Sequence, residues 1–386
     1  MLYAPDLHER LTERAWNEGW IRDAIARLIA DAGRRYDDES LWPAHEWDAY
    51  TAPLPLTDLY AGAAGVAWAL HVLRPLSDSR LDPDRVVRRT LAHFRSDPEF
   101  LERSGFPEQR RSSLLCGESG ILLVAYLVRP TRDLADDLFA LVSANLDNPA
   151  NELMWGVPGT LLVARTLAAA TGEARWSAAV RESEDALRAQ RADDGFWQQT
   201  LEGRTTRYLG PVHGLVGNVL ALGEPGKAAA ILRDCAVAED GLANWPPAQG
   251  GEPNRLQWCH GAPGILLHAH TYLDDDLLLG GAELVWRAGP FGDEKGAGIC
   301  HGTAGNGYAL LRAFEHTGDE RWLDRARRFA VHALEQAERL PGRYALFTGG
   351  VGAARFAADC LEGRALFPVL EDLPAAGRGT SGARAL

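Results

Sequence analysis

The feature that most constrains the fold is a short glycine pattern, Gly-x-x-Gly, which recurs seven times along the chain. Small or apolar residues follow the copies, which lie about 40 to 60 residues apart. Such a period is typical of folds in which one supersecondary unit repeats and buries its apolar face against its neighbours. The glycine pairs are Gly62/Gly65, Gly117/Gly120, Gly156/Gly159, Gly214/Gly217, Gly261/Gly264, Gly302/Gly305 and Gly349/Gly352.

Two kinds of helix are expected in each repeat. The stretch after each glycine pair is apolar nearly all round, which is typical of a buried helix. The stretches between them, such as residues 20–29 and 134–142, carry apolar side chains at helical spacing on one face. The phrase at 171–176 also matches the phrase at 317–322, with a glycine that ends one helix and an acidic residue that opens the next.

Seven buried helices inside seven amphipathic ones predict an all-α fold, the α/α toroid. The glycines would begin the inner helices, where backbones crowd around the axis and a Cβ would clash. We expect one domain over residues 1–372. Residues 373–386 are expected to be a disordered tail, because they have the composition of a disordered chain end.

The repeats differ at the position directly before the first glycine, which the toroid places near the axis. Histidines occupy it in repeats four to six, as His213, His260 and His301. A cysteine precedes the histidine in two of them, as Cys259 and Cys300. A structural repeat needs only the glycines, so this concentration of polar chemistry predicts a functional site.

The two Cys-His pairs predict a zinc site. Zinc binds cysteine sulfur and histidine nitrogen in tetrahedral geometry, and a catalytic site leaves one position open, so two cysteines and one histidine would suffice. The alternative is a pair of buried structural thiols, which is how we interpret Cys116, whose neighbours are apolar. His260 and His301 are not both expected to bind, because adjacent side chains diverge at a helix start.

Four further residues are candidates for the site. His213 would face the metal and is interpreted as a general acid or base, the alternative being a capping histidine. Glu152 precedes a helix start, where it could assist or could be an ordinary exposed carboxylate. Arg255 and Lys295 lie shortly before the cysteines and could hold a carboxylate or an enolate oxygen, the alternative being solvated loop charges.

Composition excludes several classes of function. A formal net charge of −13 argues against a nucleic acid as partner. Five scattered cysteines do not make a disulfide framework, and they suit a reducing compartment. We find neither a signal peptide nor an apolar run of about 18 residues, so we expect no membrane span and a cytoplasmic location.

At these motifs the chain resembles the LanC family, the lanthionine synthetase C cyclases, together with their eukaryotic LanC-like relatives. The resemblance covers nearly the whole chain. It rests on the seven glycine pairs, on His-Gly at 213–214, on Trp-Cys-His-Gly-Ala-Pro-Gly at 258–264 and on Cys-His-Gly-Thr-Ala-Gly-Asn at 300–306.

This resemblance implies an α/α toroid with one zinc ion per chain. The implied ligands are Cys259, Cys300 and His301, with His260 beside the ligands rather than bound to the metal. The acid/base histidine of the family falls on His213.

Other residues resemble the LanC-like branch in particular. Glu152 stands where lanthipeptide cyclases tend to carry an aspartate, and Lys295 matches a lysine that contacts glutathione in that branch. Phe367-Pro368 resembles its C-terminal Phe-Pro. The arginine that the branch carries after the Glu152 motif is replaced here by Val157-Pro158, so the sequence is intermediate.

The residues and the resemblance together predict a zinc-dependent enzyme. It would activate a thiol for Michael-type addition to dehydroalanine or dehydrobutyrine in a peptide, forming lanthionine-type thioethers. His213 would move a proton, Glu152 would assist, and Arg255 would stabilise an enolate. The alternative is addition of glutathione or another small thiol to dehydrated residues in proteins. A separate dehydratase or kinase–lyase would prepare either substrate.

Two other classes of function are less favoured. A glycosidase or epimerase on a related toroid needs paired carboxylates at the axis, and only Glu152 is expected there. A zinc-stabilised scaffold without catalysis would have no use for an open coordination position.

Overall fold

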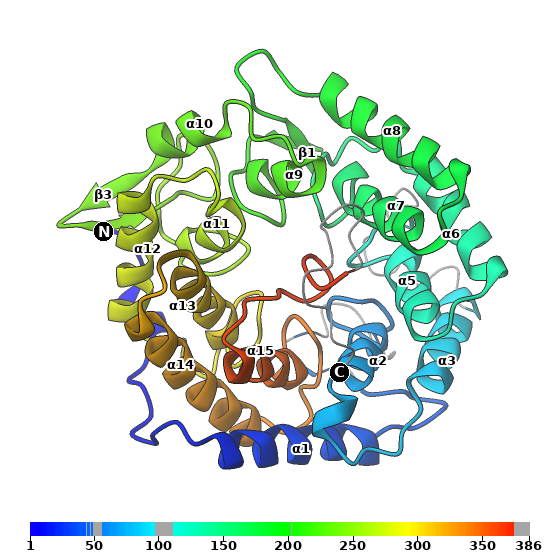
Figure 1. Ribbon diagram of the computed structural model, residues 1–386, viewed down its shortest axis with the longest axis horizontal. Helices are drawn as coiled ribbons and strands as arrows, with labels where there is room; N and C mark the ends of the chain where they lie inside the picture. Colours follow the sequence, from blue (N-terminus) through cyan, green and yellow to red (C-terminus); the bar gives the residue numbers. More distant parts are fainter. Residues whose placement is uncertain (44, 47, 49–55, 97–110, 202, 374–386) are drawn as a thin grey trace.

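In the computed structural model the helices form a closed double ring (Figure 1). The structure describes residues 1–43, 45–46, 48, 56–96, 111–201 and 203–373. Within these residues, outer and inner helices alternate along the chain, seven of each. The inner helices are α2 (Ala63–Val72), α5 (Glu118–Val128), α7 (Val157–Thr171), α9 (Leu215–Leu222), α11 (Ala262–Ala269), α13 (Thr303–Thr317) and α15 (Gly350–Glu362). The outer helices are α1 (Glu18–Arg34), α3 (Pro83–Ser96), α6 (Arg132–Ala144), α8 (Ala174–Ala189), α10 (Ala228–Cys235), α12 (Asp275–Ala288) and α14 (Glu320–Arg339).

The ring closes because the first and last helices of the chain pack against each other. Outer helix α1 contacts α15 and α14, and inner helix α15 contacts α2. The predicted α/α toroid of seven inner and seven outer helices is therefore confirmed.

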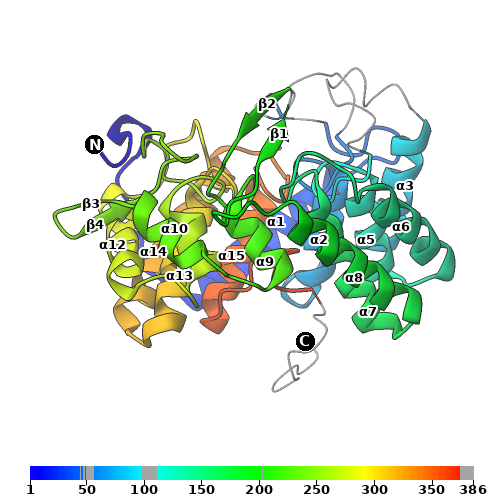
Figure 2. The ribbon, with the colours of Figure 1, turned by 90° about the horizontal axis from the view of Figure 1, so that it is seen from above.

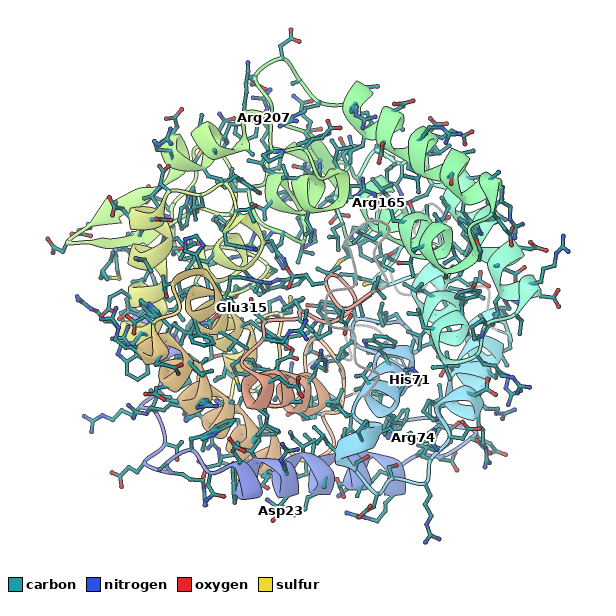
Figure 3. All side chains as sticks on the ribbon, in the orientation of Figure 1. Asp23, His71, Arg74, Arg165, Arg207 and Glu315 are labelled. Carbon is teal, nitrogen blue, oxygen red and sulfur yellow. The ribbon has the colours of Figure 1, made fainter. Side chains whose placement is uncertain are left out.

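Burial separates the two layers as the apolar pattern predicts. In α9, an inner helix, seven of eight residues are buried, whereas in α10, an outer helix of the same length, only three are. Charged side chains lie on the outer surface, as Asp23 does on α1 at the edge of the ring (Figure 3). An inner helix therefore meets other helices all round, and an outer helix meets them on one face.

The second glycine of every pair is required by a close backbone approach. A Cβ placed there would lie 1.8 to 2.3 Å from the carbonyl oxygen of the residue six positions earlier, in all seven repeats. Real Cβ atoms do not approach an oxygen so closely, so no other residue fits without a backbone shift. The predicted clash at the inner helix starts is thus observed, although the clashing atom belongs to the preceding loop of the same repeat.

Backbone hydrogen bonds join these loops around the axis. The amide of Cys300 donates to the carbonyl of Phe347, and Phe347 donates to Tyr60, at 2.8 and 3.1 Å. Tyr60 then donates to Leu115 and Leu115 to Met154, at 2.9 and 3.4 Å. All five residues stand two positions before the first glycine of their repeats. Equivalent residues of successive repeats are therefore joined by hydrogen bonds, and the position of each loop depends on that of the next.

Two β-hairpins interrupt the helical pattern, and the sequence analysis did not predict them. The strands β1 (Gln199–Leu201) and β2 (Arg204–Thr206) pair antiparallel, and so do β3 (Val237–Glu239) and β4 (Leu242–Asn244). The turn of the second hairpin is Asp240-Gly241, both with positive φ, a sequence typical of a tight hairpin. In Figure 2 the hairpin β1–β2 rises from one end of the ring.

The described residues do not test every expectation. Of the expected tail only Leu373 is described, and residues 374–386 lie outside the described part of the chain. The limits of a single domain at 1–372 stay a prediction. None of the described helices combines the length and the apolar character that crossing a bilayer requires.

The glycine constraint predicts the effect of Gly120→Ala. The new Cβ would lie 2.1 Å from the Leu114 carbonyl oxygen and 2.9 Å from Leu59 Cβ, so the free energy of unfolding should fall by about 1–3 kcal/mol or more. Gly19→Ala is the control, because Gly19 is an exposed helical residue whose nearest atom is a side-chain oxygen of Asn17 at 3.3 Å. Urea denaturation measures both, and equal losses would contradict the steric argument.

Candidate metal centre

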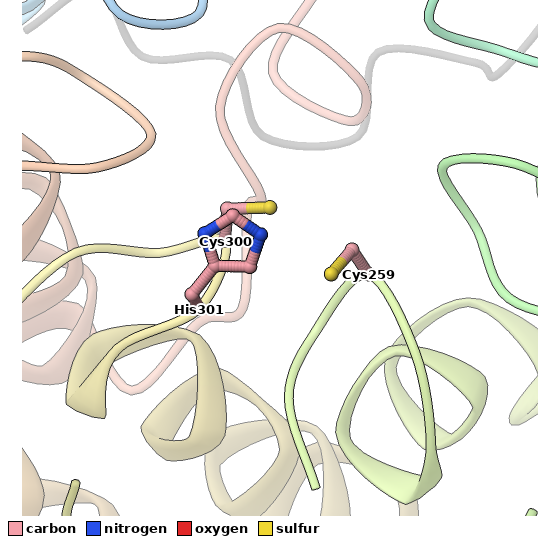
Figure 4. A group of neighbouring side chains, drawn as sticks. All are labelled: Cys259, Cys300 and His301. Atoms are coloured by element: carbon pink, nitrogen blue, oxygen red, sulfur yellow. The ribbon is translucent and has the colours of Figure 1, made fainter. Parts of the chain in front are cut away.

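The loops before two neighbouring inner helices carry the expected metal ligands. Cys259 precedes α11, Cys300 and His301 precede α13, and these two helices pack together. The two sulfur atoms and a ring nitrogen of His301 all lie within 4.8 Å of one another. Figure 4 shows both thiols and the imidazole converging. Side chains 41 residues apart in sequence are thus brought to one point.

The donor set fits a zinc ion. Zinc binds cysteine sulfur at about 2.3 Å and histidine nitrogen at about 2.0–2.1 Å, so three donors this close can share one ion. Both thiols are almost fully buried, whereas His301 is partly exposed. Three protein donors leave the fourth tetrahedral position for an exchangeable ligand.

The two thiols affect each other's ionisation. Burial opposes the thiolate form of Cys259, but the hydrogen bond from Cys300 and the charge of His301 outweigh it and lower the pKa of Cys259 well below its usual range. Burial and the adjacent Cys259 raise the pKa of Cys300. A cation bound between the two buried sulfurs would stabilise the thiolate form of both.

A buried carboxylate holds the third histidine of the register. Oε2 of Glu152 lies 2.7 Å from Nδ1 of His213, although the two residues are 61 positions apart. The Glu152 side chain is fully buried, and it also accepts backbone hydrogen bonds from Met154 and Trp155. Because a carboxylate only accepts, Nδ1 of His213 carries the proton, and Nε2 is the nitrogen left for another partner.

Glu152 also changes the acidity of this histidine. Burial lowers the pKa of His213, but the hydrogen bond and the negative charge of Glu152 outweigh burial, and the net pKa is raised. Glu152 is therefore not an ordinary exposed carboxylate, which was the alternative interpretation, because it is buried and contacts His213. The structure pairs the two residues, and their roles in a reaction stay proposals.

His260 is next to Cys259 in the chain and contacts His213 through space. Its ring stacks on His213 with centroids 5.7 Å apart, and Tyr208 packs against both rings. Burial lowers the pKa of His260 to about 4, and its Nδ1 has no hydrogen-bond partner among the described residues. His260 is not one of the three clustered donors. It is a neutral, buried ring that adjoins both Cys259 and His213.

Arg255 and Lys295 line one cavity of about 340 Å³, together with His301. The N-terminal segment forms another wall through Leu7 and His8. Arg255 is exposed and Lys295 is partly exposed, and neither side chain has an ion-pair partner within the described part of the chain. The two cations therefore share a hollow with a candidate metal ligand rather than lying on separate loops.

Three residues near the ligands were missed by the sequence analysis. Gln257 donates a hydrogen bond of 2.8 Å to the Cys259 sulfur, and Tyr60 lies against His301 and interacts with the Cys300 thiol. Tyr208 packs on the histidines as described. The repeat register could have indicated Tyr60, which occupies the position of the two cysteines in repeat one. No pattern in the sequence singles out Gln257 or Tyr208.

Comparison with known proteins identifies the family. A family model for the lanthionine synthetase C-like protein matches residues 54–370. The chain belongs to this family.

Curated relatives of the lanthionine synthetase C-like family match parts of the chain. Glutathione S-transferase LANCL1 of Danio rerio is 33% identical over 189 residues, covering 42% of this chain and 46% of the relative. LanC-like protein GCL1 of Arabidopsis thaliana is 31% identical over 126 residues, 28% of each chain. Each match therefore spans less than half of the relative's length.

A solved structure supports the fold. Nisin cyclase aligns over 89% of this chain and 93% of its own, with a TM-score of 0.54 and 14% identity. At this identity the likeness concerns the arrangement of helices, and it agrees with the double ring described above.

Metal analysis tests the centre. We expect about one zinc per chain in the purified protein, and loss of that zinc in Cys300→Ala, because two donors hold the ion too weakly. Cys360→Ala is the matched control, since Cys360 is a free and fully buried cysteine on α15 outside the cluster. Elemental analysis after dialysis measures both variants. Zinc retained by Cys300→Ala would refute the ligand assignment.

Proposed function

We propose that this protein adds a thiol to dehydroalanine or dehydrobutyrine in a peptide and so forms a thioether. The observation that carries the proposal is the placement of the His213–Glu152 pair next to the cysteine–histidine cluster, since His213 stacks on His260, which directly follows Cys259. A thiol held at the cluster would have a proton-transferring group on the neighbouring loop, because α9 and α11 pack together. Family membership supports an enzyme of this class.

In this proposal Cys259, Cys300 and His301 hold one zinc ion per chain. When bound, zinc lowers the pKa of a thiol at its open position and so supplies thiolate near neutral pH. Gln257 keeps the Cys259 sulfur oriented through its 2.8 Å hydrogen bond. Burial of both cysteines protects the site from water and from exchange of the metal.

The proton and electron balance of the addition suggests a role for each of the other candidate residues. A bond forms between sulfur and the β-carbon, and the electron pair of the carbon–carbon double bond moves toward the α-carbon and the carbonyl oxygen. The thiol loses one proton and the α-carbon gains one, so nothing else is consumed. His213 takes or delivers that proton through Nε2, while Glu152 fixes its tautomer. Arg255 stabilises the negative carbonyl oxygen.

The cavity favours a small acidic thiol as the donor. Arg255 and Lys295 line it beside His301, and its volume of about 340 Å³ is that of a small-ligand site. Glutathione carries two carboxylates, which two cations can bind. The relative from Danio rerio is named as a glutathione S-transferase. Ring closure by a cysteine of the substrate peptide is the second candidate, because the same centre would activate that thiol.

The proposed reaction requires a second enzyme and is compatible with a reducing compartment. A separate dehydratase or kinase–lyase must supply the substrate, since the proposed site removes no water from serine or threonine. All five cysteines are free, which suits a reducing compartment such as the cytoplasm.

An addition assay with His213→Gln tests the reaction. Purified protein is mixed with a dehydroalanine peptide, with and without glutathione, and with a peptide that also contains cysteine; mass spectrometry identifies the products. We expect an adduct with the wild type and a rate lower by about 10²–10⁴-fold in His213→Gln. The control His316→Gln changes an exposed histidine paired with Asp275 on the outer helix α12. No adduct and no ring with zinc-loaded wild type would contradict the proposal.

The rate–pH profile of Glu152→Gln tests the pairing. The Glu152 charge raises the pKa of His213, so removing that charge should lower this pKa. The limb of the kcat/KM profile that reports on His213 should then move to lower pH, whether the histidine acts as acid or base. A limb that stays in place or moves to higher pH would exclude this role of Glu152.

Lys295→Met tests the donor site. We expect a higher KM for glutathione with little change in kcat, because the lost charge binds the donor and does not take part in bond formation. The KM for cysteamine, which has no carboxylate, should stay unchanged. Lys227 is the other lysine of the chain, and Lys227→Met is the control. Equal effects on both thiols would show that Lys295 does not bind a carboxylate.

A further inference from the structure

After α15 the chain turns back across the middle of the ring (Figure 1). This segment, residues 365–372, packs against the inner helices α11 and α13. Its Phe367 is fully buried, and the ring lies 5.4 Å from His268 of α11 and 5.2 Å from Tyr308 of α13. The segment therefore reaches the wall of the ring that also carries the metal ligands.

Phe367 makes its closest ring contact with the residue next to a candidate ligand. It stacks on Trp258 with centroids 4.5 Å apart and an interplanar angle of 19°. Trp258 is fully buried and directly precedes Cys259. Its carbonyl oxygen is the atom that a Cβ at Gly264 would meet at 1.8 Å. The backbone of Trp258 is thus held against α11, and its ring is held by the C-terminal segment.

A chain of hydrogen bonds joins the same segment to the other edge of Trp258. The indole Nε1 donates to Nε2 of His268 at 2.9 Å, so the proton of that imidazole is on Nδ1. Nδ1 donates to Glu371 at 3.1 Å, and Arg312 of α13 donates to the other oxygen of Glu371 at 2.6 Å. Glu371 therefore fixes the tautomer that His268 needs to accept from Trp258.

The end of the segment is tied to α15. Asp372 accepts a 2.6 Å hydrogen bond from the amide of Val369, and its other oxygen lies 3.9 Å from Nε of Arg355. Arg355 also pairs with Asp359 on the same helix. A long ion pair to α15 thus adds to the contacts that Phe367 and Glu371 make with α11 and α13.

We propose that residues 365–372 form a brace that positions Cys259 through Trp258. The inference rests on the proposed metal centre, because the role of the brace is to hold one of its ligands in place. Phe367 and Glu371 touch neither the cluster nor its cavity, so they act as positioning residues. Partners that orient a metal ligand in this way change metal affinity by about 10–100-fold, and small shifts of a ligand are enough to do so.

Phe367→Leu tests the brace against Phe356→Leu. Both phenylalanines are fully buried and both contact Tyr308, but only Phe367 stacks on Trp258 among the described ring contacts. We expect zinc release to a chelator to be about 10-fold faster in Phe367→Leu. The visible absorption of the cobalt-substituted protein should also change in that variant. Phe356→Leu should keep the wild-type release rate and cobalt spectrum, even where its thermal midpoint falls as far.

Glu371→Gln provides a second test should Phe367→Leu fail to fold. Its control is Glu283→Gln, since Glu283 also pairs with arginines, Arg287 and Arg325, but has no contact with His268 or with residues 365–372 among the described interactions. Faster zinc release in Glu371→Gln alone supports the brace. If a variant and its control release zinc at equal rates and lose the same amount of thermal midpoint, the segment contributes only ordinary core packing and the brace is contradicted. A wild-type protein without zinc would overturn the metal centre and the brace together, whereas zinc-loaded protein with unchanged release in Phe367→Leu would overturn the brace alone.

Discussion

The structure depends on a close approach between each inner helix and the loop that precedes it. A carbonyl oxygen from that loop lies where the Cβ of the second glycine would be, in all seven repeats. Because the loop is pressed against its helix, the residues between carbonyl and glycine are fixed at the start of that helix. Hydrogen bonds such as those of Tyr60 with Leu115 and Phe347 then join one loop to the next. The ring is thus a rigid support, and a few positions in its loops hold the candidate functional residues.

The candidate functional side chains lie in three consecutive repeats, four to six, which carry histidine directly before the first glycine. The cysteines and His301 come from two adjacent loops, and His213 comes from the loop before them. Such a site is more exact than one on free loops, because each residue is set by the same backbone approach. The supports differ in kind: Glu152 fixes His213 by a buried charge, and Phe367 fixes Trp258 by stacking.

The charge near the candidate metal centre differs from the charge of the protein as a whole. The protein has a net charge of −13, yet the cavity beside His301 holds Arg255 and Lys295 without ion-pair partners among the described residues. Most arginines elsewhere are paired, as Arg312 is with Glu371. In the proposed reaction, these two unpaired cations would attract an anionic ligand toward the candidate metal centre.

The sequence by itself determined the toroid. Glycine spacing and apolar periodicity are local patterns, and both recur in every repeat. It also indicated Cys259 and Cys300, since they share one register, and the resemblance to the family selected His301 rather than His260 as the third ligand. Only the tertiary structure decided what the register does not encode. The contact of Glu152 with His213 and that of Phe367 with Trp258 join residues 61 and 109 positions apart. Such contacts depend on how the ring closes, and no local pattern records them.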